Sequence, residues 1–136
     1  MKNLVINEAN CTGKDLGGRV VTWLYTPETM ETQYCSVCTV VYESGARAVP
    51  AHSHVAGEET VYVTEGTGKV LIGEDIYDIQ PGSIMFFPQG IPHMMYNTGN
   101  VPLKGICFYA PSAEAIGYTF HEDVDFPEFQ KVSANV

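Results

Sequence analysis

The sequence predicts an all-β sandwich or barrel with little helix. Short apolar or alternating runs are separated by glycine, proline and asparagine or aspartate turns, and helical periodicity is nearly absent. A chain of 136 residues has the usual length of one domain, and such a domain buries roughly two thirds of the surface of its unfolded chain. We therefore expect one domain over residues 1–136, with its core at about residues 35–110.

The expected strands are short and follow one another closely. They are residues 20–25, 34–42, 52–54, 59–64, 68–72, 76–79, 84–88, 93–97 and 103–109. The connections carry matching turn residues, since residues 65–68 suit a tight hairpin, residues 80–82 a type II corner and residues 97–100 a further reversal. So many short strands in a domain of this size indicate a sandwich or a barrel.

Composition and charge exclude several classes of partner. Seven Lys and Arg residues stand against sixteen Asp and Glu, a formal charge of −9, so no basic footprint for nucleic acid is expected. No apolar run approaches the roughly 20 residues that cross a bilayer. The first residues contain no long apolar segment of the kind found in signal peptides. We expect a cytoplasmic protein that binds neither nucleic acid nor membrane.

Cys35 and Cys38 form a C-x-x-C motif, which can indicate zinc or redox chemistry. In a continuous strand, residues three apart face opposite ways at about 10 Å, which is beyond the roughly 7 Å limit for a disulfide. We therefore interpret the cysteines as packing residues.

His52 and His54 are the most informative pair in the sequence. Residues at i and i+2 share one face of a strand, and the preceding proline and the β-branched residues after them favour a strand here. The turn at residues 55–58 allows Glu59 to return over the two imidazoles. Glu58 is the alternative, but Glu59 shares a strand face with the apolar residues Val61 and Val63, so we expect Glu59 to point inward.

The segment from Gly82 to Asn97 resembles the second conserved motif of the cupin family. Gly82, Pro88, Gly90, His93 and Asn97 stand at every anchor position of that motif. The resemblance extends over roughly residues 35–110.

The first cupin motif is matched by His52, His54, Glu59 and Gly66. One departure occurs, since six residues rather than five separate Gly45 from His52. The resemblance to cupins implies a jelly-roll β-barrel, a double-stranded antiparallel sandwich, with one divalent metal held by His52, His54, Glu59 and His93.

The donor set itself indicates the kind of ion. Imidazoles and one carboxylate suit iron, manganese, nickel, zinc, cobalt or copper, and the absence of thiolates argues against a closed structural zinc site. Four protein ligands leave positions for a small-molecule substrate. We expect an enzyme acting on a hydroxy or keto acid, a carboxylate or a sugar derivative, with isomerase, lyase or decarboxylase, and dioxygenase chemistry all open.

Two other function classes compete with the enzyme. One alternative is a module that binds or senses a small molecule without turnover, and the other is a metal-stabilised structural barrel. In the enzyme, Glu59 or a nearby tyrosine would move a proton. Arg47 is an alternative partner for a substrate carboxylate, although a solvated arginine is the more common case.

The remaining expectations concern the cavity and the ends of the chain. We expect the cavity wall to include Trp23, Tyr25, Phe87 and Met95. Asn97 should tie a turn by an Asx-type hydrogen bond. His121 is not expected to be a ligand, and the phenylalanines of residues 120–129 should pack across a barrel face or a partner. A homodimer that exchanges residues 20–25 is expected.

Overall fold

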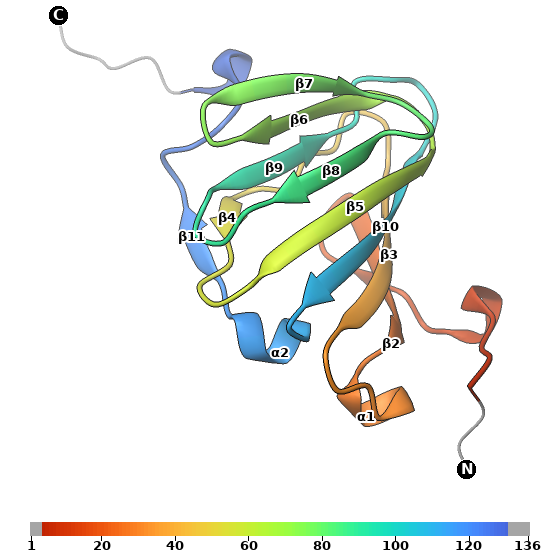
Figure 1. Ribbon diagram of the computed structural model, residues 1–136. Coiled ribbons are helices and arrows are strands. Elements are labelled where there is room, and N and C mark those ends of the chain that lie inside the picture. The colour runs from red at the N-terminus through yellow and green to blue at the C-terminus, as the bar shows by residue number, and fades with distance from the viewer. Residues whose placement is uncertain (1–3, 131–136) are drawn as a thin grey trace, which may run out of the picture.

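The computed structural model describes residues 4–130 as two antiparallel sheets that face each other around a common interior (Figure 1). The six-stranded sheet has the order β1 (Lys14–Asp15), β2 (Arg19–Tyr25), β3 (Ser36–Tyr42), β10 (Leu103–Ala110), β5 (Glu58–Glu65) and β8 (Ile84–Phe87). The five-stranded sheet has the order β11 (Thr119–His121), β4 (Ala51–Ser53), β9 (His93–Tyr96), β6 (Gly68–Ile72) and β7 (Asp75–Ile79). This is the jelly-roll sandwich that the sequence predicts.

Helix is confined to short pieces, as expected. They are α1 (Pro27–Met30), α2 (Ala113–Ile116) and two 3-10 turns at Glu8–Asn10 and Pro127–Phe129. α1 begins with Thr26 and Thr29 in a reciprocal capping arrangement, and Pro27 occupies the first position, where its missing N–H costs nothing. In the described residues, no helix has the length and apolarity to cross a bilayer.

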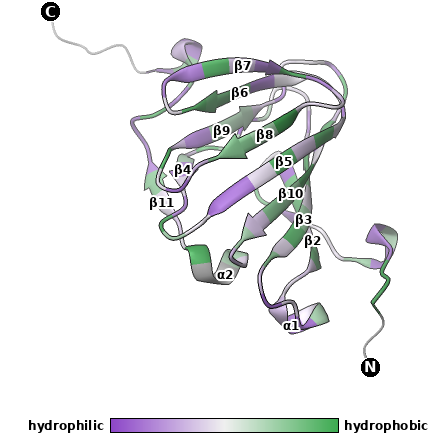
Figure 2. Ribbon diagram, viewed as in Figure 1, coloured by the Kyte–Doolittle hydropathy of each residue, from purple (hydrophilic) through white to green (hydrophobic). Residues whose placement is uncertain are grey.

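Alternation along the strands places the core between the sheets. In β5, Glu59, Val61 and Val63 are buried whereas Glu58 is exposed and Tyr62 is 42% exposed. Figure 2 shows that β5 begins with hydrophilic residues, Glu58 and Glu59, before its apolar residues. The inward face of β5 therefore carries the apolar residues of the core and one carboxylate.

All nine predicted strands are present, and their boundaries move by a few residues. The strand predicted from residue 34 starts at Ser36, and Tyr34 is 78% exposed. β1 and β11 were not predicted, because strands of two and three residues carry too little pattern of their own and are defined by pairing with β2 and β4.

The C-terminal segment packs against the outside of β9. Phe126 is fully buried, and its ring lies 5.3 Å from that of Tyr96. Arg47 holds the segment through a bidentate pair with Asp125, at 2.8 and 2.9 Å, and its guanidinium stacks on Phe129. The prediction that the phenylalanines pack across a barrel face is confirmed for Phe126, whereas Phe120 is 63% exposed.

Candidate metal centre

The five-stranded sheet brings three histidines together. His52 on β4 and His93 on β9 are partners in the ladder between these strands, so their side chains emerge side by side. His54 lies just beyond the end of β4, two residues after His52. The imidazole centroids are 4.5 Å apart for His52 and His93, and 5.1 Å for His54 with each of the others.

The six-stranded sheet supplies the carboxylate from the opposite side. Glu59 on β5 is paired with Phe87 on β8 and with Tyr109 on β10. It is 4% exposed and therefore points into the barrel. Gly57 makes the preceding turn possible, because a Cβ there would lie 2.7 Å from the carbonyl oxygen of Ala110.

The four side chains form one compact cluster of ligand atoms. The atoms offered by His52, His54, Glu59 and His93 all lie within 4.8 Å of one another. Glu59 Oε1 is 2.8 Å from His54 Nε2 and 3.4 Å from His93 Nε2. Ligands bound at right angles to one ion, each at about 2.1 Å, lie about 3 Å apart, so this spacing suits a shared metal.

Backbone carbonyls fix the orientation of two imidazoles. His54 Nδ1 lies 3.2 Å from the carbonyl oxygen of Gly117, and His93 Nδ1 lies 3.3 Å from that of Ile91. A carbonyl only accepts, so each Nδ1 donates and each Nε2 of a neutral ring presents its lone pair to the cluster. The ring of Phe87 stacks on His93 at 3.9 Å with planes 9° apart and holds it in place.

Two observations show that the cluster fits a cation. His93 Nε2 is buried without a hydrogen-bond partner. His54 faces an acceptor at each nitrogen, although a neutral imidazole has only one N–H. A cation between these nitrogens and Glu59 satisfies both conditions. The residues present therefore fit a divalent transition ion, whose identity this donor set does not fix.

Burial and neighbouring charges keep His52 and Glu59 in the forms that bind metal. Burial, together with the neighbouring His93, lowers the pKa of His52 to about 3, so its ring is neutral. Burial alone would raise the pKa of Glu59, but the contacts with His54 and His93 outweigh it and lower this pKa to about 2. Neutral imidazoles and an ionised carboxylate are the species that metals require.

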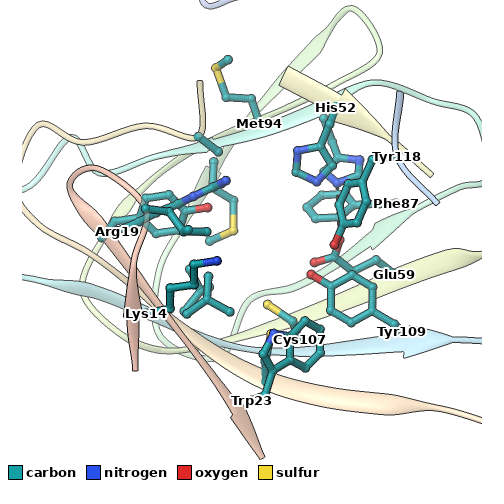
Figure 3. Close-up of a pocket in the computed structure, with 18 residues that line it drawn as sticks. Lys14, Arg19, Trp23, His52, Glu59, Phe87, Met94, Cys107, Tyr109 and Tyr118 are labelled. Carbon is teal, nitrogen blue, oxygen red and sulfur yellow. Dashed lines mark ion pairs between the residues drawn. The ribbon is translucent and has the colours of Figure 1, made fainter. Parts of the chain in front are cut away.

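A cavity of about 210 Å³ lies against the ligand cluster (Figure 3). Of the side chains expected in its wall, Trp23, Phe87 and Met95 line it. Further lining residues come from both sheets and from the segment before β11, and they include Lys14, Arg19, Val21, Cys38, Tyr42, Cys107, Tyr109 and Tyr118.

Tyr25 is not among the residues that line the cavity, contrary to expectation. The register of β2 and β3 shifts between Trp23 and Tyr25, since Trp23 is paired with Cys38 but Tyr25 with Val37. The extra residue in β2 places Tyr25 on the opposite face from Trp23. Sequence parity alone carries no sign of such a bulge.

Several polar residues that line the cavity were not predicted. Tyr118 precedes β11 and lies over the histidines, with its ring 5.3 Å from His52 and 5.0 Å from His54. Its phenol lies beside that of Tyr109, and this contact favours the ionised phenol and so opposes the effect of burial on the pKa of Tyr118. The alternation of aromatic and polar residues at 118–121 was the available signal for a strand here. Lys14 reaches the cavity through the unpredicted pairing of β1 with β2, and Arg19 through the pairing of the first residue of β2 with Tyr42 on β3.

Two further expectations are decided by contacts. Arg47 is neither a solvated arginine nor part of this cavity, because it pairs with Asp125. His121 lies outside the ligand cluster and hydrogen-bonds to Ser53 Oγ at 2.8 Å.

The cysteines are all free thiols, as the packing interpretation requires. Cys38 and Cys107 are buried partners on β3 and β10, and Cys35 is half-buried. The contact between Cys38 and Cys107, together with burial, raises the pKa of the Cys107 thiol well above its usual range.

Chains similar in sequence or in structure match most of the length of this protein. An uncharacterized protein of Methanocaldococcus jannaschii is 27% identical over 111 residues, covering 82% of this chain and 83% of its own. A predicted oxalate decarboxylase of Thermotoga maritima superimposes with a TM-score of 0.72 at 20% identity, covering 79% and 99% of the two chains.

An oxalate oxidase solved with glycolate also superimposes on this chain, with a TM-score of 0.69 at 22% identity. The match covers 86% of this chain and 63% of the oxidase. At these identities the structural likeness is one of fold. The sequence profile of the cupin domain, by contrast, matches residues 38–109, more than half of the chain and all four clustered side chains. The protein therefore belongs to the cupin domain family.

Proposed function

We propose that the chain is a metal-dependent enzyme acting on a small polar metabolite, a hydroxy or keto acid, a carboxylate or a sugar derivative. One observation carries the proposal: the buried, unpartnered Nε2 of His93 belongs to a cluster of four ligand atoms at the wall of a cavity. A barrel of this size does not need such a cluster to fold, since its core already encloses apolar residues from both sheets.

The resident ion would be iron, manganese, nickel, zinc, cobalt or copper, held by His52, His54, Glu59 and His93. When bound, it supplies Lewis-acid chemistry at a substrate oxygen and, if it is iron or manganese, reactivity toward oxygen. Isomerase, lyase or decarboxylase, and dioxygenase reactions all use a substrate chelated in this way.

The chain supplies its own proton donors beside the ligands. The phenols of Tyr109 and Tyr118 lie beside each other and next to the Glu59 carboxylate (Figure 3). Phenols are protonated at neutral pH, and burial raises the pKa of Tyr118 further, to about 12. We assign Tyr118 the donation of a hydrogen bond or a proton to a substrate oxygen, and Tyr109 its orientation.

Glu59 serves the site mainly as a ligand in this proposal. A carboxylate whose pKa is about 2 is a weak base, so the transfer of a proton by Glu59 itself is the less favourable route. The apolar side chains of Trp23, Phe87 and Met95 keep bulk water from the reacting atoms, which strengthens every electrostatic contact in the cavity.

The known chemistry of similar folds supports acids as substrates. The similar oxalate oxidase was solved with glycolate, a substrate analogue, and the Thermotoga maritima protein is described as a predicted oxalate decarboxylase. Both descriptions concern short carboxylic acids, and we extend that substrate class to this chain as part of the proposal.

Turnover of a panel of acids and sugars tests the proposal. Protein loaded in turn with each ion is assayed for product and for oxygen consumption. Tyr118→Phe should lower kcat at least about tenfold with little change in metal content, because it removes one hydroxyl from the cavity. Tyr77→Phe, at a 51% exposed tyrosine on β7, is the matched control and should not change kcat. If the protein instead binds an acid or sugar saturably and in a metal-dependent way, but shows no turnover with any of the ions, it is a small-molecule binding protein and not an enzyme.

We also propose a cytoplasmic homodimer. An apolar patch on the outer face of the six-stranded sheet supports self-association, where Tyr62, Ile84, Phe86 and Phe108 are each more than 40% exposed. β2 is a poorer candidate for strand exchange, because β1 already pairs with Val20 and Val21 along that edge. Sedimentation of the wild type should give a dimer and Ile84→Glu a monomer, whereas a monomeric wild type at micromolar concentration would contradict the proposal.

A further inference from the structure

Two cationic side chains face the candidate metal centre across the cavity. Figure 3 shows Lys14 and Arg19 on one side and His52, Glu59 and Tyr118 on the other. They come from β1 and β2, where Lys14 is paired with Val21, another lining residue. Gly17 and Gly18, both at positive φ, form the connection between these strands, which brings the two cations to one wall.

The charges of the cavity are unbalanced. The chain has only seven Lys and Arg residues against sixteen acids, yet two of the cations line this cavity together with a single carboxylate, Glu59. Glu59 is engaged by the histidines and, in the proposed enzyme, by the ion. Among the described residues, neither Lys14 nor Arg19 makes an ion pair.

The Arg19 guanidinium retains free hydrogen-bonding capacity. It lies beside Tyr42, its partner on β3, and a guanidinium carries five N–H donors. Glu43 borders a neighbouring surface hollow together with Arg19 but forms no ion pair with it. Arg19 is half-buried, so its planar guanidinium presents hydrogen-bond donors toward the cavity. Lys14 is exposed and adds positive charge at the rim of the cavity.

The wall between the two polar ends is apolar. Val21, Trp23, Val40 and Met95 line it. A polyhydroxylated substrate would leave its hydroxyl groups without partners there, whereas a short hydrocarbon spacer fits. The cavity of about 210 Å³ suits a molecule of a few carbon atoms.

We infer that the cavity is built for a small dianion, with a hydroxy- or keto-acid group at the metal and a second carboxylate or phosphate held by Arg19 and Lys14. This inference rests on the proposed function and narrows its substrate class from polar metabolites to short diacids and phosphorylated acids. It assigns Arg19 as a specificity-determining residue and Lys14 as a source of charge at the rim.

Matched ligand pairs separate the two ends of the cavity. Malate and 2-hydroxybutyrate share the chelating head and differ in a terminal carboxylate against a methyl group, as do 2-hydroxyglutarate and 2-hydroxyvalerate one carbon longer. 3-Phosphoglycerate tests a phosphate at the same end. Calorimetric titration of Zn²⁺-loaded protein should give at least about tenfold tighter binding of at least one dianion than of its monoanionic match, as a charge-assisted hydrogen bond provides.

Arg19→Gln should abolish that preference while leaving the affinity for the monoanions within about twofold. Lys14→Gln should weaken dianion binding less, and its effect should fade in 0.5 M salt because Lys14 is exposed. Lys69→Gln is the charge-matched control, since Lys69 pairs with Asp78 on the surface and does not line the cavity. Circular dichroism and bound zinc, measured for each variant, verify that the fold and the metal centre are intact.

The outcomes distinguish the inference from the proposed function. Equal affinity for both members of every pair, or an unchanged preference in a folded Arg19→Gln variant, overturns the second subsite while metal-dependent binding of the acids persists. If none of the acids binds the zinc-loaded protein more tightly than the metal-free protein, the metal-centred function itself fails. If the preference for a dianion over its monoanionic match persists after zinc is removed, the dianion does not bind with its acid group at the metal. That result would also overturn the inference.

Discussion

His52 and His93 are direct partners in the ladder between β4 and β9, although 41 positions separate them in the sequence. Pairing of two short strands therefore sets the spacing of two candidate ligands. Glu59 reaches them from the other sheet, so a bound ion links both layers of the sandwich. An ion that binds the folded chain but not the unfolded chain raises the free energy of unfolding. The increase is about 2.7 kcal/mol when the free ion concentration is a hundred times the dissociation constant.

Replacement of Glu59 should remove this stabilisation. Glu59→Gln is expected to weaken metal binding by more than the roughly 10- to 100-fold loss typical of outer-shell partners, because it removes the only anionic donor of the cluster. Glu58→Gln is the matched control, since Glu58 is the exposed neighbour on the same strand. Competition against a zinc indicator measures both. An equal loss of zinc affinity in the two variants would refute the assignment of Glu59 as a metal ligand.

Phe87 is expected to support both the core and His93. It is 1% exposed and stacks on the imidazole, so Phe87→Ala should cost about 3–5 kcal/mol of unfolding free energy. Phe86→Ala, at a 51% exposed site, should cost far less. Urea denaturation of the metal-free forms gives both values, and metal titration of Phe87→Leu isolates the loss of the stack. Similar costs for Phe86→Ala and Phe87→Ala would contradict the inward placement of Phe87.

The metal-free protein should lose stability as the pH falls below 6.5. Burial lowers the pKa of His52 from 6.5 to about 3, so between these values the unfolded chain binds a proton that the folded chain does not. The free energy of unfolding therefore rises with pH in this window, by up to about 1.4 kcal/mol per pH unit near pH 5 from this residue.

Urea midpoints at pH 5.0 to 6.5 test this dependence. His52→Gln should flatten the slope in this range, whereas His121→Gln should retain the contribution of His52. Identical slopes in the wild type and His52→Gln would show that His52 titrates normally in the folded chain.

Asn97 should be required for stability and not for metal binding. Its amide donates to the carbonyl oxygens of Tyr42 and Val101 and accepts from the N–H of Gly99, the Asx-type bond expected from the sequence. Asn97→Ala removes three bonds at a fully buried site and should cost on the order of 3 kcal/mol. Asn100→Ala, at an exposed site in the same loop, should be near neutral. Loss of bound metal in folded Asn97→Ala would contradict the structural role.

The sequence allowed prediction of the strands and the ligand cluster for a physical reason. His52, His54, Glu59 and His93 lie in regular strands or next to them, where a period of two decides which side chains face inward. That rule separates Glu59 from Glu58 without any knowledge of tertiary structure.

The residues missed by the sequence depend on irregular or non-local features. Tyr25 was placed in the cavity wall because a bulge cannot be read from parity. Tyr118 and Lys14 lie beside or in the short edge strands β11 and β1, whose positions follow from pairing with β4 and β2. Arg19 is the first residue of β2, one position before the predicted start of that strand. The cluster of candidate metal ligands was therefore predictable, whereas the polar groups on the opposite wall of the cavity were not.

The metal content of the purified protein tests the central claim most directly. Elemental analysis of the wild type, of His93→Ala and of His121→Ala, each checked by circular dichroism, requires no knowledge of the substrate. The wild type and His121→Ala should hold about one transition ion per chain, and His93→Ala should hold far less while remaining β-rich. A wild type that binds no ion, even after reconstitution with each candidate metal, would contradict the account.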